Sequence, residues 1–183
     1  MNQQLIICGV GGQGILFVTR LLAESAIAKG LPVLTSETHG MAQRGGIVVS
    51  HLKVGAFPSP LVRPGRADAL LSLKPETVAL HLHFLKEGGT VAANAQQPLA
   101  EVAGHPASLI DADALALSLG DPQAVNLIVL GCALARSGTL FCTADEVEAV
   151  IRRKMAGKDK QLARALAAFR AGLEAGGKED GAC

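Results

Sequence analysis

The sequence of 183 residues is long enough for one domain with a sizeable core, and its hydrophobic fraction of 49% excludes a disordered chain. Its 17 basic and 16 acidic residues leave a net charge of +1, which gives no indication of a surface for nucleic acid or another polyanion. Trp and Tyr are absent and only five Phe are present, so we expect a mostly aliphatic core and no aromatic platform for single-stranded nucleic acid.

The chain opens with a strand, a turn and a helix. An apolar strand is predicted at residues 5–8, and a glycine-rich turn follows at residues 9–14. Apolar residues then recur along one helical face over residues 15–29, and Gly30 after them predicts the end of the helix. A second strand is predicted at residues 33–35. We therefore expect a βαβ unit with parallel strands and a right-handed crossover.

Two more strands are predicted after a polar loop at residues 37–46. Residues 47–54 are rich in β-branched side chains and predict a strand, and residues 67–73 predict a buried one. Pro75 suits the first turn of a helix that runs to about residue 85.

The middle of the chain continues the alternation of strands and helices. Glycines at residues 88–89 predict a turn between this helix and a strand at residues 90–93. A short strand is expected at residues 108–110, and Asp111 is placed to cap a helix at residues 112–119.

The last third of the chain is predicted to be helical. One helix is expected at residues 123–136. Thr143 and Glu146 have the spacing of a capping box and predict the start of a second helix. A third helix is expected at residues 160–175, where apolar residues recur at helical spacing, and a flexible tail at residues 176–183.

These elements predict one fold for the whole chain. We expect a single Rossmann-like α/β domain over residues 1–175, with a mainly parallel sheet and helices on both faces. The sequence has no internal repeat and no clear domain boundary.

The cysteines indicate a reducing compartment. Cys8, Cys132, Cys142 and Cys183 include no CxxC pair, so neither an iron–sulfur motif nor a zinc pattern is present. The first two lie in apolar runs and are predicted to be small core residues. The N-terminus lacks the basic residues of a signal peptide, and the longest uncharged apolar stretch, residues 127–135, is too short to span a bilayer. We therefore expect a cytoplasmic protein.

The glycine-rich turn is the first candidate binding site. Gly9, Gly11 and Gly14 match G-x-G-x-x-G directly after a strand and at the start of a helix, with Gly12 and Gln13 between them. Small residues let a phosphate approach the backbone, and unpaired N–H groups at a helix N-terminus carry partial positive charge. A phosphate-bearing ligand is one interpretation. The alternative is that the glycines only pack the helix against the strand or meet a partner chain.

Glu37 keeps a dinucleotide interpretation open. A dinucleotide site requires an acid near the end of the second strand, roughly 20 residues after the glycines, and Glu37 follows Gly14 at a similar interval. The alternative is that Glu37 begins a loop and is solvated.

The loop after Glu37 is unusual for a dinucleotide domain. It places His39, Gln43 and Arg44 beside Gly45, where such domains normally enter a second helix. Arg44 could hold a phosphate or a carboxylate through two parallel hydrogen bonds. An ordinary exposed or ion-paired arginine is the alternative.

The two motifs in this order resemble a known family. GVGGQGIL at residues 9–16 and ETHGMAQRGG at residues 37–46 are similar to the gamma-type subunit or domain of pyruvate, ketoisovalerate and indolepyruvate:ferredoxin oxidoreductases. The similarity continues at residues 50–53, at residues 67–71 and at Asn126, and so covers most of the chain. The length is similar to that of the small subunit of the indolepyruvate enzyme.

One position departs from the family pattern. The C-terminal helix of the family commonly carries an Asn before an Ala-Phe pair, and Ala165 stands in its place ahead of Ala168 and Phe169. This difference affects the expected ligand and subtype.

The resemblance implies a role within a larger enzyme. In the family, a 2-oxoacid is oxidatively decarboxylated with thiamine diphosphate, coenzyme A takes the acyl group, and ferredoxin receives electrons through iron–sulfur clusters. The thiamine and cluster sites lie mainly on other subunits. We therefore expect no catalytic residue and no metal on this chain, which would help to assemble the complex and to form the coenzyme A site. The larger subunit is the expected partner, and a homodimer is expected for the isolated chain, which should be inactive.

Two other functions remain as alternatives. An independent NAD(P)- or FAD-binding oxidoreductase would use Glu37, and a non-catalytic binding protein could share the fold. The five histidines are too scattered in sequence to indicate a catalytic triad. His81 and His83 are two residues apart in a predicted helix, so they would make a poor metal pair.

Overall fold

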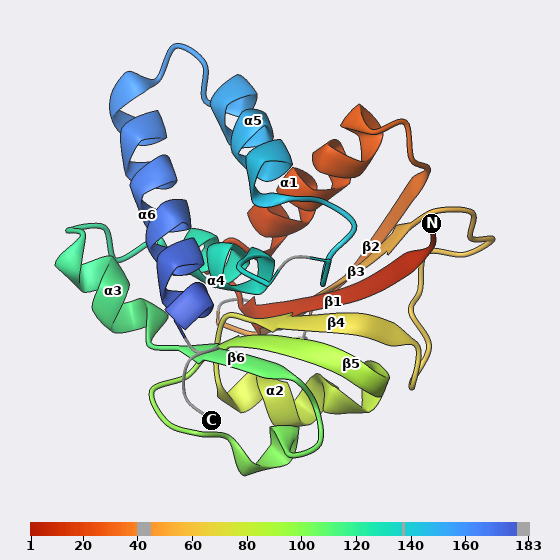
Figure 1. The fold of residues 1–183 in the computed structure, drawn as a ribbon. Coiled ribbons are helices and arrows are strands. Elements are labelled where there is room, and N and C mark those ends of the chain that lie inside the picture. The colour runs from red at the N-terminus through yellow and green to blue at the C-terminus, as the bar shows by residue number, and fades with distance from the viewer. Residues whose placement is uncertain (40–44, 137, 179–183) are drawn as a thin grey trace.

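The computed structural model describes residues 1–39, 45–136 and 138–178. Six strands form one sheet in the order β2-β3-β1-β4-β5-β6 (Figure 1). The strands are β1 (Gln3–Val10), β2 (Val33–His39), β3 (Ile47–Val54), β4 (Ala67–Ser72), β5 (Leu85–Asn94) and β6 (Ala107–Ile110). The pairs β1–β4, β4–β5 and β5–β6 are parallel. The expected mainly parallel α/β sheet is confirmed.

Strand β3 is antiparallel to both of its neighbours, β1 and β2. Strands β1 and β2 are therefore parallel to each other, as expected for the ends of a βαβ unit, but they are not adjacent. Strand β3 follows β2 in the chain and lies between β2 and β1, hydrogen-bonded to both. This insertion decides where the end of β2 lies relative to the glycine turn.

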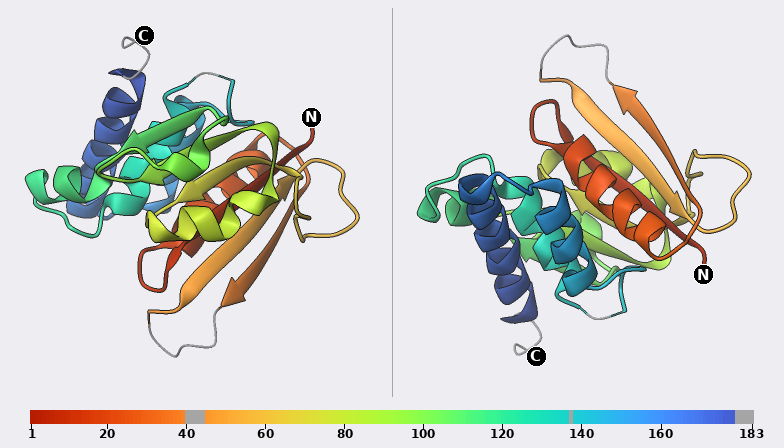
Figure 2. Two further views of the ribbon diagram at one scale, coloured as in Figure 1. Left: turned by 90° about the horizontal axis from the view of Figure 1, so that it is seen from below. Right: turned by 90° about the horizontal axis from the view of Figure 1, so that it is seen from above.

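Helices cover both faces of the sheet, as expected (Figures 1 and 2). The helices are α1 (Ile15–Ala28), α2 (Glu76–His81), α3 (Ala112–Ser118), α4 (Val125–Leu134), α5 (Ala144–Lys154) and α6 (Asp159–Lys178). Helix α2 lies on one face, and α1, α4, α5 and α6 lie on the other. Among the described residues, no helix combines the length and the apolar character that a bilayer span requires.

The predicted helix ends follow local capping chemistry. The Asp111 side chain accepts a hydrogen bond from the Ala114 N–H at 2.9 Å and caps α3. Thr143 and Glu146 form the reciprocal capping box of α5. Gly30 ends α1 with a φ of 71°, a conformation that glycine adopts without strain.

Three expected boundaries are corrected by the structure. Strand β2 extends through His39, so the segment from Glu37 to His39 is strand and not the start of a loop. The helix after Pro75 ends at His81 and continues as a 3-10 turn. The glycines at residues 88–89 lie inside β5, where the register against β4 shifts, because the extra residues form an irregularity within one strand and not a connection between two.

Helix α4 is the centre of the core. Nearly all of its residues are buried, since it lies between the sheet and α6. A Cβ atom on Gly131 would lie 2.1 Å from the Phe169 carbonyl oxygen, and one on Gly172 would lie 2.0 Å from the Ile128 carbonyl oxygen. The two backbones therefore touch. Helix α6 runs to Lys178, three residues beyond the boundary at 175 expected for the domain.

Candidate functional site

The glycine turn lies at the carboxyl edge of the sheet, where the parallel strands end. It joins β1 to α1, beside the end of β4 (Figure 1). Gly12 and Gly14 have φ values of 99° and 82°, which are strained for any residue with a side chain. The helix after β1 covers one face and the helix after β4 covers the other, so this is a switch point at which open α/β sheets bind ligands.

Gln13 holds the turn in shape. Its Oε1 accepts a hydrogen bond from the Val10 N–H at 2.8 Å, and its Nε2 donates to the Leu73 carbonyl at 3.1 Å. A Cβ on Gly9 would lie 2.8 Å from the Gln13 Oε1. Gly9 therefore makes room for the Gln13 side chain, which links the ends of β1 and β4.

Asn126 holds the other side of the turn from the first turn of α4. Its Nδ2 donates to the Gln13 carbonyl at 3.1 Å. A Cβ on Gly14 would lie 2.1 Å from that Nδ2, so only glycine permits this approach. Asn126 belongs to the motifs of the family resemblance but was not among the predicted site residues. No local pattern in the sequence connects it to the turn.

The turn presents backbone donors at its open side. The Gly11 N–H donates to the Gly46 carbonyl at 2.9 Å, which ties the turn to the start of β3. In the described part of the chain, the N–H groups of Gly12, Gly14, Ile15 and Leu16 have no acceptor. The last two belong to the first turn of α1, where the helix dipole adds positive character. The arrangement can bind an anion.

Glu37 and His39 lie away from this turn. Both belong to β2, which is separated from β1 by β3, and two strand spacings amount to about 10 Å. In a dinucleotide site, the strand that carries the acid lies directly beside the first strand. Glu37 therefore does not take the place of the ribose-binding acid. Gly45 is described and has a φ of 74°, whereas Gln43 and Arg44 lie outside the described residues.

The carboxyl edge continues past β4 as a polar cleft of about 350 Å³. Its lining includes Lys74, Glu76, Gln96 and Gln97, together with Asn94. Sequence reasoning did not select these residues, although Lys74 follows a buried strand directly. The cleft has side chains of both charges, so its chemistry indicates no single ligand.

Asn94 makes protein hydrogen bonds through both ends of its amide. The Nδ2 donates to the Asp113 Oδ2 at 2.9 Å and to the Leu73 carbonyl at 3.3 Å, and the Oδ1 accepts from the Ala112 N–H at 3.0 Å. The side chain is 1% exposed. Asn94 therefore stabilises the ends of three strands and is not a free ligand-binding group.

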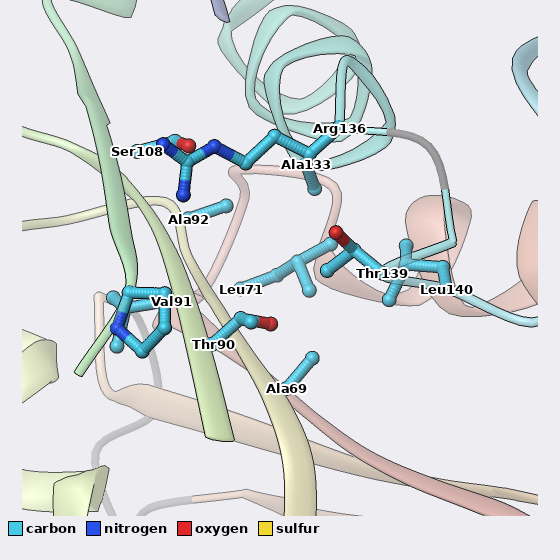
Figure 3. Close-up of a pocket in the computed structure, with 11 residues that line it drawn as sticks. Ala69, Leu71, Thr90, Val91, Ala92, Ser108, Ala133, Arg136, Thr139 and Leu140 are labelled. Atoms are coloured by element: carbon cyan, nitrogen blue, oxygen red, sulfur yellow. The ribbon is translucent and has the colours of Figure 1, made fainter. Parts of the chain in front are cut away.

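A separate hollow lies between the sheet and the chain after α4 (Figure 3). Thr90 and Ser108 point into it from the sheet, and Arg136 lies across it. Its volume is about 20 Å³, which suits a water molecule and excludes a cofactor.

Three histidines surround Phe84 on the α2 face. The ring centroids of His51, His81 and His83 lie 5.4, 6.4 and 4.2 Å from that of Phe84. The His51 Nδ1 accepts a hydrogen bond from the Val62 N–H at 3.2 Å. Burial lowers the pKa of His51 and of His81, so both are neutral. This cluster is a packing feature on the face opposite α1.

The described cysteines are poor nucleophiles and poor cluster ligands. Cys8, Cys132 and Cys142 are buried, which confirms the prediction that the first two are core residues. Burial raises the pKa of the Cys8 thiol and raises that of Cys142 to about 12, which favours the protonated form. Within the described residues, no group of three His, Cys, Asp or Glu is placed to hold a metal ion.

Comparison with known proteins identifies the family. The family model described as pyruvate ferredoxin/flavodoxin oxidoreductase matches residues 4–175. The chain belongs to this family. The predicted resemblance is thereby confirmed, together with the role of a subunit in a 2-oxoacid:ferredoxin oxidoreductase, and an independent dinucleotide enzyme is not favoured.

Relatives of this oxidoreductase subunit carry similar names. The chain is 31% identical to the indolepyruvate oxidoreductase subunit IorB of Archaeoglobus fulgidus, over 86% of this chain and 88% of the relative. It is 32% identical to IorB of Pyrococcus horikoshii, over 81% of this chain and 84% of the relative. These relatives are subunits of multi-subunit oxidoreductases, which implies larger partner subunits for this family member.

Solved structures share the fold. The 2-oxoglutarate:ferredoxin oxidoreductase of Magnetococcus marinus, with 2-oxoglutarate, coenzyme A and succinyl-CoA bound, superimposes with a TM-score of 0.80 at 20% identity. The match covers 97% of this chain and 31% of that one. Pyruvate oxidoreductase subunit PORC of Thermotoga maritima gives a TM-score of 0.78 at 20% identity, covering 94% of this chain and 96% of that one.

Proposed function

We propose that this chain is the small subunit of an indolepyruvate-type 2-oxoacid:ferredoxin oxidoreductase and that it supplies part of the coenzyme A site. The observation that carries the proposal is the glycine turn. Its N–H groups at Gly12, Gly14, Ile15 and Leu16 face the carboxyl edge without an acceptor among the described residues. A diphosphate would provide the acceptors, in the manner of other anion sites at helix N-termini.

The named relatives support the substrate and the cofactor. The IorB relatives match more than four-fifths of the chain, which favours indolepyruvate or another aryl or branched-chain 2-oxoacid. A protein of the same fold is known with coenzyme A bound. Arg44 remains a predicted second contact for the diphosphate.

The proposed roles of the two subunits follow from the residues present on this chain. Thiamine diphosphate and iron–sulfur clusters on the larger subunit supply the decarboxylation and the electron transfer to ferredoxin. This chain contributes binding and orientation through backbone donors held in place by Gln13 and Asn126. The buried, protonated thiols of Cys8 and Cys142 suit a reducing compartment, so we place the protein in the cytoplasm.

The test is reconstitution with the larger subunit. We expect the complex to reduce a viologen dye with a 2-oxoacid only when coenzyme A is present, with the highest kcat/KM for indolepyruvate among indolepyruvate, pyruvate and 2-ketoisovalerate. The control is each subunit assayed alone. Turnover by the isolated small subunit, or full turnover of the complex without coenzyme A, would contradict the proposal.

A further inference from the structure

The connection between β3 and β4, residues 55–66, forms a loop at the amino end of the parallel strands. In Figure 2 (left), it is the gold segment beside the marked N-terminus. Val54, just before the loop, pairs with Gln3 at the start of β1, whereas Val10 at the other end of β1 enters the glycine turn. The eight residues of β1, at about 3.3 Å each, separate the loop from the turn by roughly 25 Å. The loop therefore belongs to a different surface from the candidate binding site.

Hydrogen bonds hold both ends of this loop. The Gly55 N–H donates to the Pro32 carbonyl at 2.8 Å, and the Arg66 N–H donates to the Phe84 carbonyl at 2.9 Å. The loop also contains three prolines, which restrict its backbone. Its conformation is therefore fixed by the chain itself, without a ligand.

The middle of the loop is anchored by Val62. Its side chain is 3% exposed and packs into the core on the α2 face, and its N–H donates to the His51 Nδ1 at 3.2 Å. The preceding residue, Leu61, is 50% exposed. The loop thus presents a large aliphatic side chain to solvent from a fixed position, where its exposure carries a free-energy cost that a partner surface would remove.

A lysine without a counter-ion lies at the base of the loop. Lys53, near the end of β3, is 7% exposed, and its ammonium lies 5.0 Å from the centre of the Phe57 ring. The ring face attracts the cation but supplies no negative charge. Burial lowers the pKa of Lys53, and the positive charge of Arg63 lowers it further. The two cations are therefore close enough to repel each other.

No carboxylate neutralises the positive charge of the loop. Among the described residues, the ion pairs involve neither Lys53, Arg63 nor Arg66. Asp68, the first acid after the loop, is already engaged by Lys86. An acidic group brought to this surface would relieve the repulsion between Lys53 and Arg63, and it would break no existing pair.

The side chains of Lys53, Phe57, Leu61, Arg63 and Arg66 are called here the basic loop surface. It combines an exposed apolar side chain on a fixed backbone with unpaired charge around it. An apolar anchor with a charged rim is the usual anatomy of a protein interface, and a preformed anchor loses little entropy on binding. The IorB relatives are subunits of multi-subunit oxidoreductases, which implies a larger protein partner for this family member.

We propose that the basic loop surface docks against an acidic surface of the larger subunit, with Leu61 in an apolar pocket and carboxylates facing Lys53 and Arg63. The inference rests on the proposed function only through the role of a subunit, and it does not require the coenzyme A site. An acidic complement is favoured because a neutral or basic surface would leave the repulsion between the two cations in place. Leu61 and Arg63 therefore govern assembly of the complex and not its chemistry.

The experiment measures the Kd between the immobilised larger subunit and the small subunit in solution. We expect Leu61→Ala to raise this Kd roughly tenfold or more, as for a buried apolar anchor. Arg63→Glu should raise it by at least as much at about 0.05 M salt and by much less at about 0.5 M salt, because salt screens the repulsion. Both side chains are exposed, so thermal unfolding of the two variants should match that of the unmodified chain.

The matched control for charge is Lys158→Glu. Lys158 is exposed and lies between α5 and α6, outside the basic loop surface, and its substitution changes the net charge by the same amount. Its Kd should equal that of the unmodified chain at both salt concentrations. A rise in Kd as large as that of Arg63→Glu would show that net charge alone is responsible and would overturn the proposal.

The remaining outcomes separate the possible partners and the two proposals. An unchanged Kd in both Leu61→Ala and Arg63→Glu would overturn the basic loop surface. If the KM for ferredoxin then rose, the surface would belong to ferredoxin, and if only self-association were lost in gel filtration, it would belong to a second copy of this chain. At saturating small subunit, the KM for coenzyme A should be the same in both variants as in the unmodified complex. Turnover without coenzyme A would overturn the proposed coenzyme A site and leave the basic loop surface intact.

Discussion

The Gln13 amide and the Asn126 amide hold the glycine turn from two sides. Gln13 bonds to Val10 and Leu73, and Asn126 bonds to the Gln13 carbonyl. The turn is thus fixed by side chains before any ligand arrives, which lowers the entropy lost on binding. At the scale of single residues, these amides matter as much as the glycines.

Gly14→Ala should destabilise the protein more than Gly12→Ala. Both positions have positive φ, which costs a side chain about 1–3 kcal/mol. Only at Gly14 does the new Cβ meet Asn126, whereas nothing lies within 4 Å at Gly12. Chemical unfolding of the two variants measures the difference. Equal losses of unfolding free energy in the two variants would show that Asn126 moves aside freely. Adding Asn126→Ala to Gly14→Ala should restore most of the extra stability lost.

Stability should fall as the pH drops below about 6.5, the ordinary pKa of histidine. Burial lowers the pKa of His51 and His81 in the folded state, so the unfolded chain takes up protons first and is favoured. The loss continues until the pH reaches the lowered folded-state values. Urea unfolding at pH 5 to 8 measures this loss of stability. The His51→Gln, His81→Gln double variant should flatten the curve over that window; an unchanged slope would assign the effect to other groups.

Arg44→Ala should raise the coenzyme A KM of the complex roughly ten- to a hundredfold, since a lost charge-assisted contact is worth about 1.5–3 kcal/mol. Gel filtration of the same variant distinguishes the alternatives. Dissociation of the complex with an unchanged KM would make Arg44 an interface residue, and no change in either would exclude both roles.

At the scale of elements, the packing of α4 against α6 fixes the helical layer. Gly131 and Gly172 allow the two backbones to touch, and the first half of α6 shares a hollow of about 320 Å³ with the first turn of α1. Helix α4 shows no amphipathic pattern because neighbours surround it.

Gly172→Ala should destabilise the protein by about 1–3 kcal/mol or more, because its Cβ would lie 2.0 Å from the Ile128 carbonyl oxygen. Gly177→Ala in the same helix is the control. Nothing lies within 4 Å there, so the change should be neutral or stabilising by up to about 1 kcal/mol. Thermal unfolding of both variants decides; similar melting temperatures would contradict close packing of the two helices.

At the scale of the whole molecule, the chain supplies a preformed edge of backbone donors and a packed core. Large apolar side chains remain exposed at Leu117 and Leu119, at the end of α3, with exposed fractions of 66% and 41%. A partner surface, in a homodimer of the isolated chain or in the full complex, would cover them.

The purified chain should be colourless and free of iron. The described cysteines are separated in the core, and burial raises the pKa of the Cys8 and Cys142 thiols, so they do not form a thiolate set for a cluster. Metal analysis and a visible spectrum of the anaerobically purified chain provide the test. Stoichiometric iron with labile sulfide would contradict it.

Local features of the fold were predictable from the sequence alone. The apolar strands, the capping residues Asp111, Thr143 and Glu146, and the position of the glycine turn were all predictable, because each depends on neighbours within a few residues. The same local logic explains the errors at residues 88–89, since a turn and a bulge need the same glycines.

The strand order and the composition of the site depend on tertiary packing. Hydrogen bonding inserts β3 between β1 and β2, which removes Glu37 from the turn, and no local pattern specifies that pairing. The approach of Asn126 to Gly14, and of Arg164 to the side of Phe17, joins segments far apart in sequence. Such contacts depend on how complete elements pack, and this packing is a property of the folded chain as a whole.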